Sequence, residues 1–116
     1  MADQEFDVVV VGSGAAGMTA ALAARKKGLS VVVVEKAPHY GGSTARSGGG
    51  VWIPGNSVLK RDGVRDTPEA ARTYLRSIVG DVVDPARIDT YIDRGPEVFE
   101  FLLTNSPLEM EWVTDY

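Results

Sequence analysis

Cysteine is absent from this 116-residue sequence, which excludes disulfides, thiolate metal sites and cysteine nucleophiles. Histidine occurs once, at His39, so a metal site built from several histidines is excluded as well. Long apolar runs are also missing. The valine runs Val8–Val11 and Val31–Val34, like every other apolar run, fall far below the roughly 18–20 residues that span a bilayer. The acidic N-terminal residues lack the layout of a signal peptide, so we expect a soluble, cytoplasmic protein without a membrane span.

No basic block occurs anywhere in the sequence. Lys and Arg number 12 against 16 Asp and Glu, which gives a net charge of −4. This balance argues against nucleic acid or an anionic membrane as the main partner. We expect Asp89 and Asp93 to lie on a solvated helix surface and Asp84 to cap a helix, rather than to bind a metal. His39, beside Pro38, is expected to be a surface residue, so we assign no catalytic residue and no metal ligand.

The first half of the sequence alternates strand, helix and strand. The β-branched runs Val8–Val11 and Val31–Val34 predict strands buried on both faces of a parallel sheet. Between them, residues 15–27 are rich in alanine and end at Gly28, which is typical of a helix and its C-terminal cap. Two strands joined by one helix must be parallel. The fold class is therefore α/β, with a Rossmann-like βαβ dinucleotide-binding unit.

The second half of the sequence predicts helices. Thr67-Pro68 begins one that runs to about Val79, and Asp84-Pro85 begins another that runs to about residue 94. Gly95-Pro96 is expected to open a third, and the alternation over residues 108–113 indicates a closing strand. We expect residues 1–60 to hold the βαβ unit with a glycine-rich loop, and residues 61–116 to form a mainly helical segment.

The motif G-x-G-x-x-G occurs at residues 12–17, directly after the first strand and at the start of the helix. Gly12 suits the tight turn, Gly14 lets the backbone approach a pyrophosphate, and Gly17 permits close packing of helix on strand. The helix N-terminus would offer free N–H groups to the phosphates. A glycine-rich turn without a ligand is the alternative.

Glu35 ends the second strand, 23 residues after the first glycine, where an acid accepts hydrogen bonds from ribose hydroxyls. A carboxylate there disfavours the 2′-phosphate of NADP, and a merely solvated acid is the alternative. The segment 41–50 favours FAD over NAD, because small residues let the backbone approach a flat ring and its phosphate or ribityl chain. Lys36 and Arg46 are either near the cofactor or simply exposed, and the hydroxyls of this segment are either ligands or solvated. The predicted cofactor-binding residues are Gly12, Ser13, Gly14, Ala15, Ala16, Gly17, Glu35, Lys36, Gly41, Gly42, Ser43, Thr44, Ser47, Gly48, Gly49 and Gly50.

From Phe6 onward the sequence resembles the start of a 3-ketosteroid Δ1-dehydrogenase. These enzymes belong to the larger flavoprotein class of fumarate reductase and succinate dehydrogenase. The βαβ unit and the EK…GGST segment are shared across that class. The runs SGGGVWIP (residues 47–54) and DTPEAA (66–71) resemble the ketosteroid branch.

This resemblance implies an FAD enzyme that introduces a C1–C2 double bond into ring A of a 3-oxosteroid. In that family a hydride goes to flavin N5 and a proton goes to a tyrosine base, which the family places outside these residues. A family active-site tyrosine is either Tyr116 or a near neighbour of it. The resemblance also implies an incomplete FAD-binding domain, an N-terminal portion that works with the remainder of the enzyme and its substrate domain. Another flavoprotein of the same class, and a nucleotide-binding module without its own chemistry, remain the alternatives.

Overall fold

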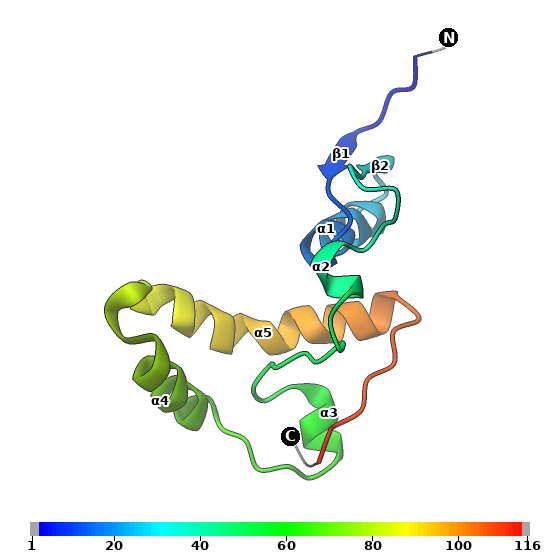
Figure 1. Ribbon diagram of the computed structural model, residues 1–116. Coiled ribbons are helices and arrows are strands. Elements are labelled where there is room, and N and C mark those ends of the chain that lie inside the picture. The colour runs from blue at the N-terminus through cyan, green and yellow to red at the C-terminus, as the bar shows by residue number, and fades with distance from the viewer. Residues whose placement is uncertain (1–2, 115–116) are drawn as a thin grey trace. The chain divides into compact units, whose positions relative to one another are not determined.

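A computed structural model of the chain describes residues 3–114, so Tyr116 lies outside the described residues. The chain forms two compact units that divide between Val51 and Trp52 (Figure 1). The elements are β1 (Val8–Val11), α1 (Ala15–Lys26), β2 (Val31–Val34), α2 (Gly42–Ala45), α3 (Ser57–Arg61), α4 (Pro68–Val79), the 3-10 turn η1 (Gly80–Val82) and α5 (Pro85–Asn105).

The first unit is the predicted βαβ arrangement. Strand β1 pairs in parallel with β2, from Val8 opposite Val31 to Val11 opposite Val34. Helix α1 connects the two strands and packs against both. It ends where predicted, at a turn in which the Gly28 N–H donates to the Arg25 carbonyl at 2.9 Å and Gly28 has a φ of +82°. The α/β class and the parallel strands are therefore confirmed.

Only one face of this sheet is covered within the unit. Val10 is buried, whereas Val9 and Val11 are 58% and 84% exposed. The alternation follows from the pleat of a strand, which sends successive side chains to opposite faces. The expectation that both strands are buried on both faces is thus wrong for the described residues, because α1 covers one face and nothing in the unit covers the other.

The second unit is built around α4 and α5. Ala71, Ile88 and Ile92 form its buried cluster, with Leu75 and Val79 packed against them. Both helices begin as predicted, each with a capping side chain followed by proline. The Thr67 hydroxyl accepts from the Ala70 N–H at 3.1 Å, and the Asp84 carboxylate accepts from the Ala86 N–H at 2.9 Å.

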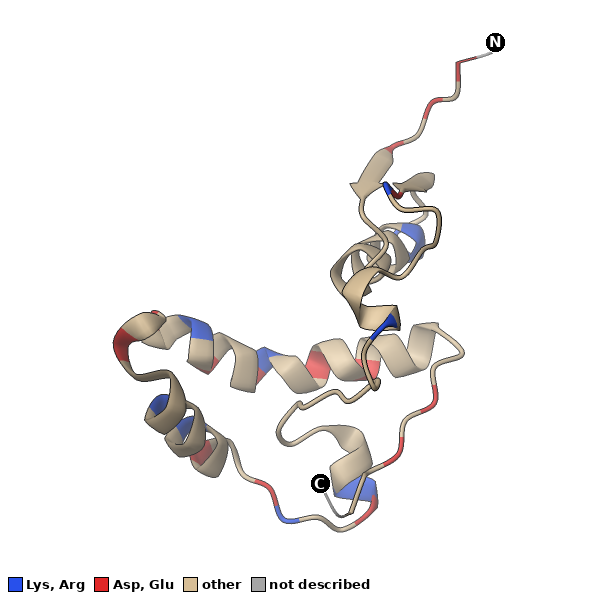
Figure 2. Cartoon of the chain, viewed as in Figure 1, with Lys and Arg blue, Asp and Glu red and all other residues tan. Residues whose placement is uncertain are grey.

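Both helices carry basic and acidic residues (Figure 2), and ion pairs join the two helices. The Arg72 guanidinium lies 3.2 Å from the Asp89 carboxylate and also binds Asp93. Arg76 reaches Asp89 at 3.1 Å. The side chains of Asp89 and Asp93 are 38% and 54% exposed, as expected for a helix surface, but the sequence did not predict their pairing with arginines of α4.

The predicted helix boundary at Gly95-Pro96 is wrong, because α5 continues through both residues to Asn105. Proline normally drives the preceding residue out of the helical region, through a clash that involves its Cβ. Glycine has no Cβ, so Gly95 relieves that clash. A Cβ at Gly95 would also lie 3.1 Å from the Ile53 side chain, so the glycine lets the chain at Ile53 approach the helix.

The closing strand predicted over residues 108–113 is absent from the described part of the chain, where the sheet consists of β1 and β2 alone. Leu108 and Trp112 are about two-fifths exposed. Alternation of apolar residues forms a strand only when a neighbouring strand accepts its backbone hydrogen bonds, and no such neighbour lies beside these residues. No helix within residues 3–114 is long and apolar enough to cross a membrane.

Candidate functional site

The turn between β1 and α1 shows why its first and last glycines are needed. Gly12 has a φ of +96°, a left-handed conformation that favours glycine, and its N–H donates to the Val34 carbonyl at 2.8 Å. A Cβ on Gly17 would lie 1.9 Å from the Gly12 carbonyl oxygen. The turn and the close packing expected of these two glycines are both present, and they place the N-terminus of α1 at the carboxyl end of β1.

Open space lies over Gly14 at the start of α1. A Cβ built there meets only the Thr44 hydroxyl, at 3.8 Å. The same hydroxyl accepts from the Ala15 N–H at 3.1 Å, while Gly14 itself supplies no capping side chain. The first N–H groups of a helix have no partner within the helix, so those of Ala16 and Gly17 remain for an anion.

Ser13 is a residue of this turn, and it is 3% exposed. Its hydroxyl donates to Oε2 of Glu35 at 2.5 Å and accepts from the Gly41 N–H at 2.8 Å. Its own backbone N–H donates to the same Glu35 oxygen at 3.0 Å. One buried side chain thus joins the glycine turn, the end of β2 and the start of the small-residue segment.

Glu35 is an exposed carboxylate held by three donors. Besides the two bonds from Ser13, its Oε1 accepts from the Ala37 N–H at 2.9 Å. The Ala37 N–H, followed by the Ser13 hydroxyl and the Ser13 N–H, lowers the pKa of Glu35 from 4.5 to about 2. The group is therefore ionised at neutral pH, and its outward lone pairs suit donors such as ribose hydroxyls.

The small-residue segment begins with the short helix α2, which sequence reasoning missed. Gly41 has a φ of +107° and Gly42 a φ of +57°. A Cβ on Gly41 would lie 2.5 Å from the Ala45 Cβ, and one on Gly42 would lie 3.4 Å from the Gly14 Cα. Two successive glycines that permit such a turn are the signal for it. The segment therefore lies directly against the turn that follows β1.

The other predicted site residues are not drawn into this cluster. The Ser47 hydroxyl donates to the Thr44 carbonyl at 2.8 Å and accepts from the Gly49 N–H at 3.2 Å, so it supports its own turn. The exposed ones are Lys36, Ser43, Gly48, Gly49 and Gly50. The structure thus groups the residues around Ser13 and leaves these others at the surface.

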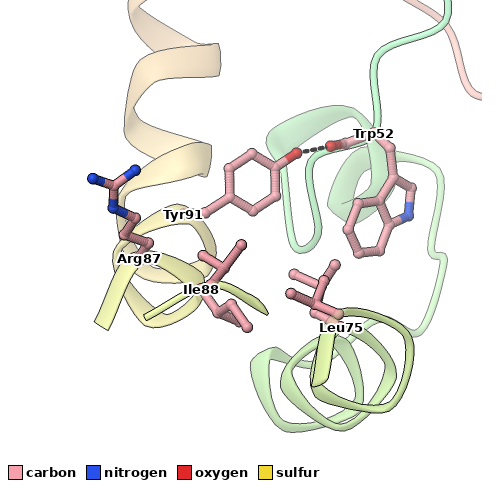
Figure 3. A pocket seen from close by; sticks show the side chains of 7 residues that line it. Trp52, Leu75, Arg87, Ile88 and Tyr91 are labelled. Carbon is pink, nitrogen blue, oxygen red and sulfur yellow. Dashed lines mark hydrogen bonds between the residues drawn. The ribbon is translucent and has the colours of Figure 1, made fainter. Parts of the chain in front are cut away.

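The second unit contains an open apolar hollow of about 350 Å³. In Figure 3 the Tyr91 hydroxyl points to the Trp52 carbonyl, to which it donates a hydrogen bond. The Tyr91 ring stacks on Trp52 with 6.3 Å between centroids, and Tyr74 meets Trp52 edge-on at 5.7 Å. Burial raises the pKa of Tyr91. Trp52, Tyr74 and Tyr91 are 50%, 55% and 41% exposed, so this aromatic group lies at the surface of the unit.

Known proteins match this chain along nearly its whole length. A 3-oxosteroid 1-dehydrogenase of Mycobacterium tuberculosis (strain ATCC 25618 / H37Rv) is 74% identical over 116 residues, which are 100% of this chain and 21% of that protein. A 4-oxocyclohex-2-ene-1-carboxylate 5-dehydrogenase of Sinomonas cyclohexanicum is 45% identical over 103 residues, 89% of this chain and 17% of that protein. The chain spans about a fifth of the length of these curated relatives.

A solved structure agrees in fold as well as in sequence. The 3-ketosteroid Δ1-dehydrogenase of Sterolibacterium denitrificans, crystallised with 1,4-androstadiene-3,17-dione, matches with a TM-score of 0.77 and 43% identity. The match covers 88% of this chain and 18% of that chain. The resemblance inferred from the sequence is confirmed. The FAD binding domain family matches residues 7–115, so the chain belongs to this family, and FAD is confirmed as its cofactor.

Proposed function

We propose that these residues are the adenosine- and diphosphate-binding part of an FAD-dependent 3-ketosteroid Δ1-dehydrogenase, which introduces a C1–C2 double bond into ring A of 3-oxosteroids. The observation that carries the proposal is the 74% identity to the mycobacterial 3-oxosteroid 1-dehydrogenase over all 116 residues. A substrate domain lies outside these residues, as the greater length of the relatives supports. We place the protein in the cytoplasm, as its composition predicts.

The cluster around Ser13 fits the adenosine half of FAD. The diphosphate would meet the N–H groups at the start of α1, where Gly14 leaves open space. The ionised Glu35 carboxylate would accept from the ribose hydroxyls. The remaining proposed contacts come from Lys36 and from the segment of residues 41–50, whose small side chains admit the flavin end.

FAD supplies the acceptor for the hydride that leaves C1. The residues of this chain hold and orient that acceptor, and to none of residues 3–114 do we assign removal of the proton from C2. The proposed tyrosine base lies elsewhere in the enzyme. The proposed role of these residues in the reaction is therefore to position the cofactor. The Glu35 carboxylate would bind the ribose and the N-terminus of α1 would bind the diphosphate, and together they would fix the position of the flavin ring.

The intact purified protein tests this proposal. We expect a yellow preparation with flavin absorption, and reduction of an artificial electron acceptor when a 3-oxosteroid is added. Gly14→Val should weaken FAD binding at least about tenfold, or about 1.4 kcal/mol, because a branched side chain would fill the space over Gly14. Ala20→Val, at an exposed position of the same helix, is the control. A colourless protein, or one whose FAD affinity survives Gly14→Val, would overturn the proposal.

A second candidate follows from the Sinomonas relative, whose name also denotes a dehydrogenase of a cyclic oxo compound. Its 45% identity favours the same cofactor with a smaller, carboxylated substrate. Comparison of kcat/KM for a 3-oxosteroid and for 4-oxocyclohex-2-ene-1-carboxylate separates the two. We expect the steroid to be preferred, and a preference for the single ring would favour the second candidate.

A further inference from the structure

We propose that Ser13 is a positioning residue of the FAD site, which holds Glu35 and the small-residue segment in place without touching the cofactor. The proposal rests on the proposed function, because it assigns Glu35 to the ribose. It differs from the sequence-based prediction, in which Ser13 binds the cofactor itself.

The burial and bonding of Ser13 leave it little to offer a ligand. The side chain is 3% exposed. A serine hydroxyl has one donor hydrogen, and Ser13 directs it to Glu35. One acceptor position takes the Gly41 N–H, and the backbone N–H also goes to Glu35. A phosphate or ribose oxygen would find no free donor on this residue, so a direct contact would require these bonds to break.

The effect on Glu35 is to fix one carboxylate oxygen and present the other. Oε2 receives both donors of Ser13, whereas Oε1 receives the Ala37 N–H. A glutamate side chain at the surface otherwise samples several rotamers, and ordering it on binding weakens affinity. Ser13 therefore orients the carboxylate before the sugar arrives.

The effect on the small-residue segment comes through Gly41. The bond from the Gly41 N–H to Ser13 lies at the start of α2, and the Thr44 hydroxyl on the Ala15 N–H forms a second link. Both links join residues far apart in the sequence. Because Ser13 also holds Glu35, its hydroxyl ties the sugar end of the site to the segment proposed for the flavin end.

A double-mutant cycle on the intact protein, stripped of FAD and titrated with it, tests this role. Ser13→Ala should weaken FAD binding about tenfold and Glu35→Gln by at least as much. The double variant should bind FAD at most about twofold more weakly than Glu35→Gln alone, because Ser13 acts largely through Glu35. Ser77→Ala, which removes an exposed hydroxyl that bonds within helix α4 of the second unit, should change the affinity less than about twofold.

Thermal melting of the flavin-free variants shows that each is folded. If Ser13→Ala does not fold, Ser13→Cys keeps the size with a weaker donor and enters the same cycle. Unchanged affinity in the Ser13 variant, or fully additive losses in the double variant, would overturn the positioning role while leaving the proposed function intact. Unchanged affinity in Glu35→Gln would instead overturn the assignment of Glu35 to the ribose.

Discussion

In the unit up to Val51, the side chains of Ser13, Glu35 and Thr44 accept hydrogen bonds from backbone N–H groups more than 20 positions away in the sequence. In the unit from Trp52 onward, the contacts between α4 and α5 are a buried apolar cluster and a set of ion pairs at its rim. The first unit therefore gathers polar groups at one point, and the second gathers apolar ones. Polar convergence is specific in direction and suits a ligand, whereas apolar packing is non-directional and suits a scaffold.

The difference also sets how each unit should respond to substitution. A buried hydroxyl such as that of Ser13 orients the groups to which it bonds, so its loss should alter FAD binding more than folding. A buried isoleucine fills space in the core, so its truncation leaves a cavity and should lower the stability of the fold. The glycines of the turn after β1 are of both kinds. Gly17 packs against backbone, so its substitution should alter folding, whereas Gly14 faces open space, so its substitution should alter binding.

The largest effect is expected for Gly17→Ala. The new Cβ would lie 1.9 Å from the Gly12 carbonyl oxygen, so α1 must move away from the turn. We expect the free energy of unfolding to fall by about 4 kcal/mol, measured by urea denaturation. Ala20→Gly, a cavity-free change in the same helix, should cost only about 1 kcal/mol. Equal losses in the two variants would remove the contrast between packing and open space at this turn.

Ile92→Ala probes the apolar cluster of the second unit. Ile92 is 3% exposed, and its truncation should lower the free energy of unfolding by about 3 kcal/mol. Ile78, on α4, is 60% exposed and serves as the control, with an expected loss below about 1 kcal/mol. FAD affinity measured at a temperature where Ile92→Ala stays folded should remain within about threefold of the wild type. A large selective loss of FAD affinity would show that the two units do not divide their roles in this way.

Arg72→Met tests the ion pairs between α4 and α5. The Arg72 side chain is 24% exposed and faces Asp89 and Asp93, so we expect a loss of about 1 kcal/mol that shrinks as salt is added. Arg61→Met, at an exposed pair with Asp62, should lose less than about 0.5 kcal/mol. Salt titrations of both variants in urea provide the measurement, and a salt-independent loss would point to packing of the arginine stem instead.

The smallest effect is expected from the titration of Glu35 in the flavin-free protein. Its pKa is lowered in the folded state from 4.5 to about 2, so the folded state favours the ionised carboxylate. The resulting stability is present above pH 4.5 and is lost as the pH falls from 4.5 towards 2. Urea midpoints across this range should fall more steeply for the wild type than for Glu35→Gln. Equal slopes for the wild type and Glu35→Gln would contradict this prediction.

The sequence predicted the βαβ unit because its signals are local. The four-valine strands, the cap at Gly28 and the starts at Thr67 and Asp84 each depend on a few adjacent residues. The prediction failed at Gly95-Pro96, where the chain uses the missing Cβ for close packing against Ile53 rather than for a break. A pattern of residue types does not show which neighbour will lie beside it.

The candidate site divides in the same way. The motif predicted Gly12, Gly17 and Glu35, whose tasks follow from backbone geometry and from position along the chain. The bonds of Ser13 to Glu35 and Gly41 were not predicted, because they join residues 22 and 28 positions apart. The residues of a turn are close both in sequence and in space. The partners of a hydrogen bond between two segments are close only in space, so the sequence pattern does not reveal them.

The uncovered valines of β1 have a practical consequence for anyone who expresses these residues alone. Val9 and Val11 expose apolar, β-branched side chains to water, and the neighbouring strand β2 is also a run of four valines. Unshielded strands of this composition stack readily with copies of themselves. Charged residues substituted at these two positions should keep such a preparation from precipitating, without disturbing the opposite face on which α1 rests.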